Sequence, residues 1–263
     1  MILKENKIRN LLNEGRSTIA TRLISTQSCF VEALGVSGNY DYVEFLGEYA
    51  PFDLYELQNF CIAAELHDMG TMIKADFQNR GFVAQKAIAS GFQAVLFTDC
   101  HNASDVKEAI RLTMPDTPED KGAFGFPNNR FIGFQSSMPQ MDHADRVRNV
   151  VRAFMIEKAS ALDEIDEICQ IPGVDMLQFG PSDYSMSRGW NKKDHVQDAL
   201  KAERLMIMTA LKYGVAVRCE IPSVEDAAYY MEMGVRNFCL GDQMNQLATI
   251  WAHDGKELRS LVK

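Results

Sequence analysis

The sequence predicts an α/β fold, a single (β/α)8 TIM barrel that spans residues 1–263. Three observations support this prediction. Helical segments alternate with short apolar runs along the chain, as in proteins built around a parallel sheet. About eight such pairs occur, and a barrel of eight strand–helix units typically has about 250 residues. No stretch has the composition of a linker between domains, so one domain accounts for the whole chain.

Most of the predicted strands begin directly after a glycine, a residue that suits the left-handed conformation at the end of a helix. The runs are often apolar without interruption, as expected for strands buried on both faces of a parallel sheet. They are TIATRLIS after Gly15, NYDYVEFL after Gly38, TMIKA after Gly70, FQAVLF after Gly91, VDMLQF after Gly173, VAVRCE after Gly214 and VRNFCL after Gly234. A further run, Val150–Glu157, lacks the glycine but has the same character.

The segments between the runs have helical patterns and recognisable helix starts. Asp53 and Glu56 form a capping box, in which each side chain accepts a hydrogen bond from the other end of the first turn. The apolar face expected behind this box consists of Leu54, Leu57, Phe60, Cys61 and Ala64. Two more helix starts are predicted at Asn102 with Asp105 and at Ser223 with Asp226.

One segment, residues 115–145, interrupts the alternation because it is rich in Pro, Gly and Asn. We predict a long ordered loop at one mouth of the barrel, and loops of this length are often lids or subunit contacts. A doubly wound open sheet is the alternative fold. It has less support, since no G-x-G-x-x-G motif follows an early strand.

Composition and charge exclude several classes of protein. The chain has 46% hydrophobic residues and 27 basic against 36 acidic residues, a net charge of −9. This balance argues against partners such as nucleic acid or an anionic membrane, which attract basic surfaces. No apolar run approaches the roughly 18 residues of a membrane span, and no C-x-x-C motif occurs among the six cysteines. We expect a soluble, cytoplasmic protein with reduced thiols.

In a barrel of this type, chemistry is expected where strands end at the C-terminal face. The predicted strand ends carry Arg22, Glu44–Tyr49, Lys74–Asp76, Thr98–Asp99, Glu157, Gly180–Asp183, Arg218–Glu220 and Gly241–Gln243.

Two carboxylates among these strand ends, Glu157 and Asp183, follow neighbouring strands. Two carboxylates with water and substrate oxygens are a common way to hold Mg²⁺ or Mn²⁺. The alternative is that each only caps a helix. Gly180-Pro181-Ser182 directly precede Asp183. Glycine lets the backbone approach a ligand closely, so the N–H groups of Ser182 and Asp183 could receive a carboxylate. The alternative here is a simple tight turn.

Four segments carry a resemblance to a known family: Gly47-Glu-Tyr-Ala-Pro51, Ile156-Glu157, Ile171-Pro-Gly-Val-Asp175 and Phe179-Gly-Pro-Ser-Asp-Tyr-Ser185. In this order they resemble the HpcH/HpaI aldolase/citrate lyase family, over nearly the whole chain. The resemblance implies a TIM-barrel, metal-dependent class II aldolase, often a hexamer, that acts on the enolate of pyruvate or a related 2-oxo acid. It also implies that Glu157 and Asp183 bind the metal and that Gly180–Ser182 bind the substrate carboxylate.

Several family positions are altered in this chain. The acid/base dyad is missing, because the histidine of the motif G-E-H-A-P is Tyr49 and its aspartate partners are replaced. The full set of departures is Leu46 and about Ala89 for aspartates, Tyr49 for histidine, Lys74 for arginine, Met155 for glutamine and Arg22 for tryptophan.

These changes alter the chemistry in a connected way. Tyr49, with an ordinary pKa of about 10, is a poor general base at neutral pH. Lys74 keeps the positive charge of arginine but loses its two-pronged geometry. Arg22 adds a cation that would favour a more anionic substrate. For Arg22, as for Arg218, the alternative is an ion pair with Glu44 or Glu220 across the barrel mouth.

Two functional hypotheses follow. The first is an active carbon–carbon lyase that acts on a 2-oxo acid with Lys74 and Tyr49 as altered catalytic residues. A variant of it makes Lys74 a Schiff-base nucleophile. The second is a relative that binds a 2-oxo acid or dicarboxylate without turnover. The resemblance further implies a homo-oligomer, a hexamer or trimer, and the apolar residues within 243–262 provide a face for packing on the barrel or on a neighbour.

Overall fold

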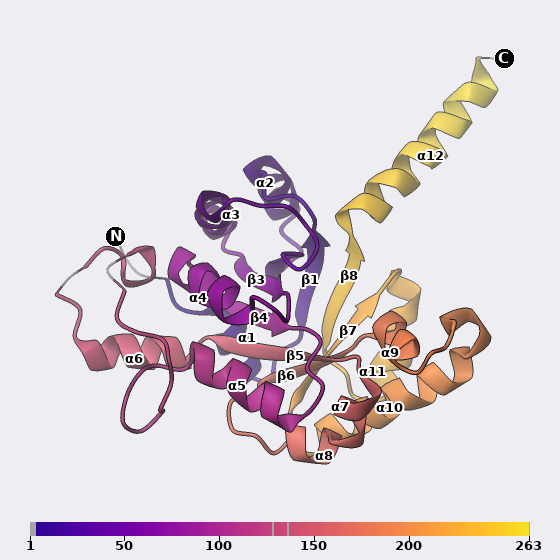
Figure 1. Ribbon diagram of the computed structural model, residues 1–263. Helices are drawn as coiled ribbons and strands as arrows, with labels where there is room; N and C mark the ends of the chain where they lie inside the picture. Colours follow the sequence, from indigo (N-terminus) through magenta and orange to yellow (C-terminus); the bar gives the residue numbers. More distant parts are fainter. Residues whose placement is uncertain (1–3, 128, 136, 263) are drawn as a thin grey trace.

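The computed structural model describes residues 4–127, 129–135 and 137–262. Its strands form one closed barrel in the order β1 to β8, with every neighbouring pair parallel, which confirms the predicted fold (Figure 1). Each strand overlaps a run that the sequence predicts, and β3, β7 and β8 extend beyond theirs by one or two residues. The strands are β1 (Thr18–Leu23), β2 (Tyr42–Phe45), β3 (Gly70–Ala75), β4 (Ala94–Phe97), β5 (Val151–Ile156), β6 (Met176–Phe179), β7 (Ala216–Ile221) and β8 (Asn237–Asp242).

Helices cover the outside of the barrel, and the predicted helix starts are confirmed. Asp53 and Glu56 form the capping box of α3, and the Asn102 side chain accepts the N–H of Asp105 at the start of α5. Leu54 is the exception on the apolar face of α3, since it is 41% exposed. The helices are α1 (Lys7–Asn13), α2 (Ser28–Val36), α3 (Leu54–Leu66), α4 (Arg80–Ser90), α5 (Ala103–Thr113), α6 (Gln140–Arg148), α7 (Ala159–Asp163), α8 (Ile165–Ile168), α9 (Pro181–Ser187), α10 (Val196–Lys212), α11 (Ala227–Glu232) and α12 (Gln243–Leu261), with 3-10 turns η1 (Arg130–Ile132), η2 (Lys192–Asp194) and η3 (Val224–Asp226).

One glycine differs from its predicted role. Six of the glycines before strands have positive φ, but Gly70 does not, because it is already the first residue of β3. Asp68 takes the left-handed conformation after α3 instead, with φ of 54°. A Cβ on Gly70 would lie 2.7 Å from Oε1 of Gln93 and 2.9 Å from Cγ1 of Ile8. Gly70 therefore makes room for the side chain of Gln93 and for Ile8 of α1.

The barrel is mostly apolar at its N-terminal end, where Thr18 and Asn237 form a buried hydrogen-bonded pair, and charged toward its C-terminal end. Ile8 of α1 is fully buried and packs on the inner apolar cluster, so that α1 closes the bottom of the barrel. Charged and amide side chains that are at most 5% exposed occupy the upper layers: Glu44, Lys74, Glu157, Gln178 and Arg218.

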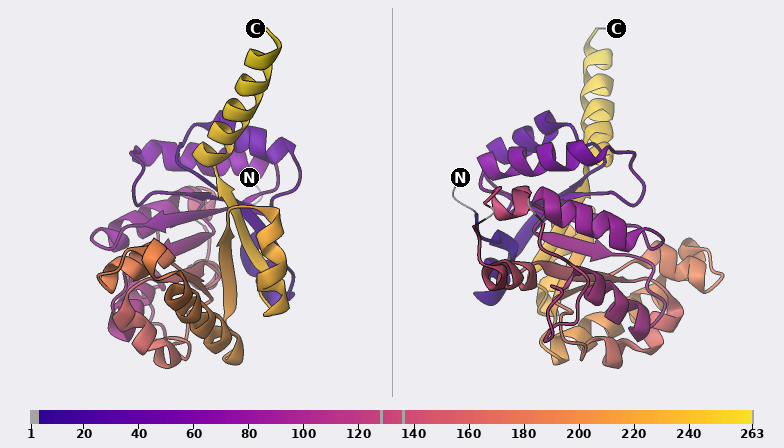
Figure 2. Two further views of the ribbon diagram at one scale, coloured as in Figure 1. Left: turned by 90° about the vertical axis from the view of Figure 1, so that its right-hand side faces the viewer. Right: turned by 60° about the vertical axis from the view of Figure 1, so that its left-hand side comes forward.

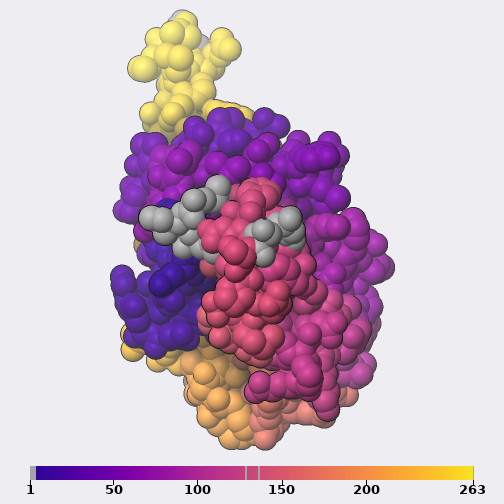
Figure 3. All heavy atoms as spheres, turned by 90° about the vertical axis from the view of Figure 1, so that its left-hand side faces the viewer, coloured from indigo at the N-terminus to yellow at the C-terminus, as the bar shows by residue number. Residues whose placement is uncertain are grey.

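The segment 115–145 lies at the N-terminal ends of the strands, because it connects α5 to β5. This is the mouth opposite the one that holds Glu157. Its last part is helix α6, which begins at Gln140, and residues 128 and 136 lie outside the described part of the chain. Figure 3 shows this segment beside the N-terminal residues, where Arg146 donates to the carbonyl of Lys4 at 2.9 Å. Its position argues against a lid over the C-terminal cleft.

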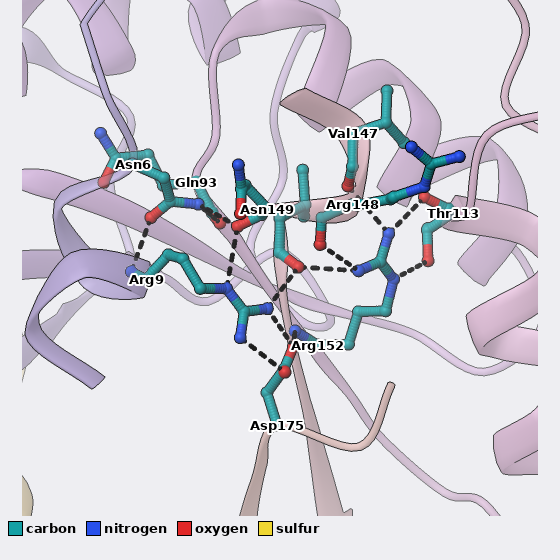
Figure 4. Close-up of polar contacts among 10 residues, drawn as sticks. Asn6, Arg9, Gln93, Thr113, Val147, Arg148, Asn149, Arg152 and Asp175 are labelled. Carbon is teal, nitrogen blue, oxygen red and sulfur yellow. Dashed lines mark hydrogen bonds and ion pairs between the residues drawn. The ribbon is translucent and has the colours of Figure 1, made fainter. Parts of the chain in front are cut away.

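Two arginines form hydrogen bonds and ion pairs with chain on either side of this segment (Figure 4). Arg152 of β5 is 1% exposed and donates to the carbonyls of Thr113, Val147, Arg148 and Val150 and to Oγ1 of Thr113. Burial lowers the pKa of Arg152 to about 10. Arg9 of α1 meets Asp175 through both guanidinium NH groups, at 2.7 and 2.6 Å. These contacts stabilise the closed end of the barrel.

Helix α12 runs away from the barrel and ends far from it (Figures 1 and 2). Among the described residues, α12 and the other helices lack the combination of length and apolar character that crossing a membrane requires.

Candidate active site

A cleft of about 1020 Å³ opens at the C-terminal ends of the strands. Seven predicted site residues line it, namely Arg22, Tyr49, Lys74, Gly180, Pro181, Ser182 and Asp183. The eighth, Glu157, is 1% exposed and lies directly behind Gly180, since a Cβ at that glycine would be 2.5 Å from Oε2 of Glu157. The fold thus brings all eight residues to one place. The absence of a side chain at Gly180 leaves room there for Glu157.

Glu157 follows β5 and is a desolvated carboxylate. The backbone N–H of Asp99, after β4, donates to its Oε1 at 2.8 Å. Burial raises the pKa of Glu157 to about 7, against the opposing effects of the Asp99 N–H and Lys74. A buried carboxylate at a strand end, with its pKa raised in this way, is a feature of functional sites.

Asp183 lies in the first turn of α9, three residues after the N-cap Gly180. A carboxylate is favourable there because the N-terminus of a helix carries partial positive charge. The N–H groups of Ser182 and Asp183 belong to the same turn, where helix N–H groups have no acceptor within the helix. The turn at 180–183 therefore combines a carboxylate with donors suited to an anionic group.

Lys74 lies at the end of β3 and is paired with Glu48. Its Nζ is 2.6 Å from Oε2 of Glu48, and both side chains are 6% exposed. Burial opposes the charge on Lys74, but Glu48 and Glu157 outweigh it and raise the pKa of Lys74. Lys74 is accordingly an ammonium ion at neutral pH.

Tyr49 is 63% exposed, and its ring centroid is 5.2 Å from Nζ of Lys74. Partial burial, then Glu48 and Asp183, raise the pKa of Tyr49 above its ordinary value. Tyr49 thus keeps its proton at neutral pH and is a hydrogen-bond donor rather than a base.

The charged groups around Glu157 form what we call the carboxylate cluster: Glu48, Lys74, Asp99, Glu157, Lys158 and Asp183. Two cations stand against four carboxylates, so the cluster has a net formal charge of −2 when all six groups are ionised. Oxygen ligands and an excess of negative charge are what Mg²⁺ and Mn²⁺ require. The residues present therefore fit a divalent cation.

Comparison with known proteins identifies the family of the chain. The model of the HpcH/HpaI aldolase/citrate lyase family matches residues 23–248. The chain belongs to this family. Hydroxypyruvate/pyruvate aldolase from Paraburkholderia phytofirmans is 23% identical over 261 residues, which cover 97% of this chain and 98% of that protein.

Two solved structures place the fold among its relatives. A family protein from Burkholderia cenocepacia J2315 superposes with a TM-score of 0.86 at 23% identity, covering 97% of this chain and 99% of that one. The citrate lyase beta subunit from M. tuberculosis, solved with oxaloacetate and magnesium, has a TM-score of 0.52 at 12% identity, covering 88% and 93%. Family membership and the aldolase name of the bacterial relative support a lyase of the aldolase type.

A second group of charged and amide side chains in this HpcH/HpaI family barrel forms what we call the arginine network: Arg22, Glu44, Gln178, Arg218 and Glu220. Arg22 lies 2.7 Å from Glu220, and Gln178 donates to Glu220 at 2.6 Å. Arg218, fully buried, contacts Glu44 and Gln178. These are the ion pairs that the sequence offered as the alternative for Arg22 and Arg218. Contact between Arg22 and substrate stays a prediction.

Sequence reasoning assigned no role to Glu48, Asp99 or Lys158, although the first two stand at predicted strand ends. The available signal was the position of Asp99 directly after a strand and of Lys158 directly after Glu157. His101, the histidine nearest the predicted mouth, is exposed and packs edge-on against Phe77.

Proposed function

We propose that the protein is a metal-dependent carbon–carbon lyase that acts on a 2-oxo acid through its enolate. The observation that carries this proposal is the pair Glu157 and Asp183. Asp183 lines a cleft that also holds the ammonium group of Lys74, and Glu157 lies directly behind Gly180 in the wall of that cleft. Their cluster has two negative charges in excess when all six of its groups are ionised. Such a site suits a small anionic substrate and a divalent cation together.

We assign Glu157 and Asp183 to Mg²⁺ or Mn²⁺. When bound, such an ion supplies Lewis-acid polarisation of the substrate carbonyl. The backbone of Gly180–Ser182 receives the substrate carboxylate at the start of α9. This assignment fits the donor set, because hard cations prefer carboxylate oxygens.

In this proposal Lys74 stabilises the negative charge on the enolate oxygen. Its pairing with Glu48 holds it as an ammonium ion, which supports charge stabilisation rather than attack on the carbonyl. The Schiff-base variant is accordingly disfavoured, since a nucleophilic lysine must lose its proton. Borohydride treatment with pyruvate should leave no adduct on Lys74, as judged by mass spectrometry, and a trapped adduct would reverse this assignment.

Tyr49 is assigned to proton donation or to the ordering of water beside the enolate. Its phenol faces the cleft and keeps its proton, for the reasons given above. A second candidate function, binding of a 2-oxo acid or dicarboxylate without turnover, is favoured by this same observation. Both Lys74 and Tyr49 hold protons at neutral pH, whereas enolisation also needs a group that accepts one.

Proton NMR of pyruvate in D₂O distinguishes the two functions. We expect the methyl signal to decay with the protein and Mg²⁺, and the decay to stop on addition of EDTA. Mg²⁺ alone and the Glu157→Ala variant are the controls. Pyruvate that binds in a metal-dependent way without exchange would favour the second function, and pyruvate that neither binds nor exchanges would contradict both functions for this substrate.

We also propose that the protein is a homo-oligomer in which α12 packs on a second copy. Apolar side chains of α12 are exposed, with Ile250 at 54%, Trp251 at 64% and Leu258 at 62%. The helix leaves its own barrel (Figure 2), and Ile19 of β1 is 43% exposed. One copy thus offers both an unpacked apolar helix and an exposed apolar side chain on β1. The hexamer or trimer expected by resemblance belongs to this proposal.

Light scattering after size exclusion tests the oligomer. Trp251→Glu should shift the mass toward the 29.6 kDa of one chain, because a buried charge opposes the packing of α12. Lys256→Glu, on the same helix, is the control for added negative charge. A monomeric wild-type protein would contradict the proposal.

A further inference from the structure

Asp99 has a backbone conformation that few non-glycine residues adopt. Its φ is 54°, and the other described non-glycine residues with positive φ, namely Asp68, Lys121 and Phe134, lie outside the cluster around Glu157. Asp tolerates the left-handed region better than most residues, although at some energetic cost. In this conformation the backbone N–H of Asp99 donates to Oε1 of Glu157 at 2.8 Å. Strain of this type often accompanies a functional constraint.

The Asp99 side chain makes a second connection to the same place. Its Oδ1 lies 2.5 Å from Nζ of Lys158, the residue directly after Glu157. The Lys158 side chain is 14% exposed and that of Asp99 is 30% exposed, so the pair is largely shielded from solvent. Glu157 is thus held from the β4 loop by a hydrogen bond to its own carboxylate and by an ion pair to the next residue.

The loop after β4, which contains Thr98 and Asp99, is itself held by the neighbouring strand. Oγ1 of Thr98 donates to the carbonyl of Ala75 at the end of β3, at 2.9 Å, and Thr98 is 1% exposed. Asp99 is therefore held on one side by its neighbour Thr98, which is bonded to β3, and on the other by the ion pair with Lys158. This arrangement limits the positions that its N–H can take.

We propose that Asp99 and Lys158 are positioning residues for Glu157. The inference rests on the proposed metal site. The Asp99 N–H holds Oε1, while Oε2 lies beside Gly180, at the start of the helix that carries Asp183. The pair acts through Glu157 and does not itself bind the ion. Its effect is to keep a desolvated carboxylate in one orientation before a cation arrives.

Residues that orient metal ligands from the outer shell typically contribute about 10- to 100-fold to metal affinity. We expect Asp99→Asn and Lys158→Met each to weaken Mn²⁺ binding about 10-fold, as measured by calorimetry. Asn also tolerates the left-handed conformation, so Asp99→Asn removes the ion pair and retains the backbone. The double variant should lose little more than either single variant, because both remove one interaction. Lys158→Arg, which keeps the cation, should retain most of the affinity.

Lys107→Met is the matched control. Lys107 pairs with Glu167 at 2.8 Å on the surface, where both side chains are more than half exposed. Its removal should leave Mn²⁺ affinity unchanged. Electron paramagnetic resonance of bound Mn²⁺ at saturation gives a readout that a mere loss of stability would not alter, and we expect a changed spectrum in Asp99→Asn and Lys158→Met.

The outcomes separate this inference from the function on which it rests. Wild-type protein that binds no Mn²⁺ would overturn both. Wild-type binding that is lost in Glu157→Ala, with affinity and spectrum unchanged in Asp99→Asn and Lys158→Met, would overturn the positioning role alone. Weaker binding with full additivity in the double variant would also overturn the ion pair as its cause.

Discussion

The two charged regions at the barrel mouth differ in their balance. In the arginine network each cation has its own carboxylate partner, Arg22 with Glu220 and Arg218 with Glu44, and Asp242 lies 3.8 Å from Arg22 at the edge of the network. The carboxylate cluster leaves two negative charges without cationic partners among its six groups, and burial raises the pKa of Glu157 within it to about 7. Balanced buried charge is compatible with a purely structural role, whereas unbalanced buried charge at strand ends indicates a site for a ligand.

Removal of a carboxylate from the cluster should have the largest effect. We expect Glu157→Ala or Asp183→Ala to weaken Mg²⁺ or Mn²⁺ binding by more than about 100-fold, because each removes one of two protein ligands. Calorimetry measures this directly. Glu220→Gln is the control from the arginine network, and it should bind the metal as wild type does. Unchanged affinity in both cluster variants would remove the metal assignment.

Breaking the arginine network should instead affect stability. Arg218→Met leaves Glu44, which is 0% exposed, without its cation. We expect a loss of about 3–5 kcal/mol in the free energy of unfolding, as for other buried pairs that lose one partner. Urea unfolding measures it. The double variant Arg218→Met with Glu44→Gln should recover part of the loss, and equal destabilisation in both variants would show that the charge on Glu44 is not the cause.

The pH dependence of the metal-free protein sharpens the contrast. Burial raises the pKa of Glu157 from an ordinary value of about 4.5 to about 7. Between these pH values the native state keeps a proton that the unfolded state has released, so the free energy of unfolding should fall as pH rises and level off above pH 7. Glu157→Gln cannot ionise and should be about 3 kcal/mol more stable than wild type at pH 8.

Thermal unfolding in EDTA, from pH 4.5 to 8, tests this contribution. The difference in stability between wild type and Glu157→Gln at each pH separates the contribution of Glu157 from that of the other titrating groups. A difference that stays constant over this range would contradict a raised pKa for Glu157. Glu220→Gln, whose parent side chain is already paired with Arg22 and Gln178, serves as the comparison from the balanced side.

The barrel could be predicted from the sequence because its signals are local. Each strand run and each helix start, such as the Asp53 capping box, depends on a few neighbouring residues. Gly70 shows the limit of this reasoning. The same glycine-before-strand pattern has a different cause there, the close approach of the Gln93 side chain and of Ile8 from α1, which no local pattern reveals.

The site was predictable only in part, for a related reason. Glu157, Asp183 and Lys74 stand at strand ends, and the barrel topology brings strand ends together. The contact between Asp99 and Lys158 depends on a left-handed backbone angle and on how two loops meet, and neither is encoded in a spacing. The ion pair of Arg22 likewise depends on the position of Glu220, which the sequence does not give.

Substitution of Arg22 should have the smallest effect. Arg22 belongs to the arginine network but lines the same cleft as Lys74 and Asp183 of the carboxylate cluster. Its guanidinium lies 2.7 Å from Glu220 and 3.8 Å from Asp242, so its charge is already matched within the wall. We expect Arg22→Met to change the KM for pyruvate exchange by less than about threefold. A dicarboxylate such as oxaloacetate is the discriminating substrate. If its KM rises more than that of pyruvate, Arg22 contacts a second carboxylate and the arginine network takes part in recognition. Equal small changes in KM for both substrates would show that Arg22 has a structural role only. This is expected if its charge is neutralised by its ion pair, which leaves little attraction for a further anion.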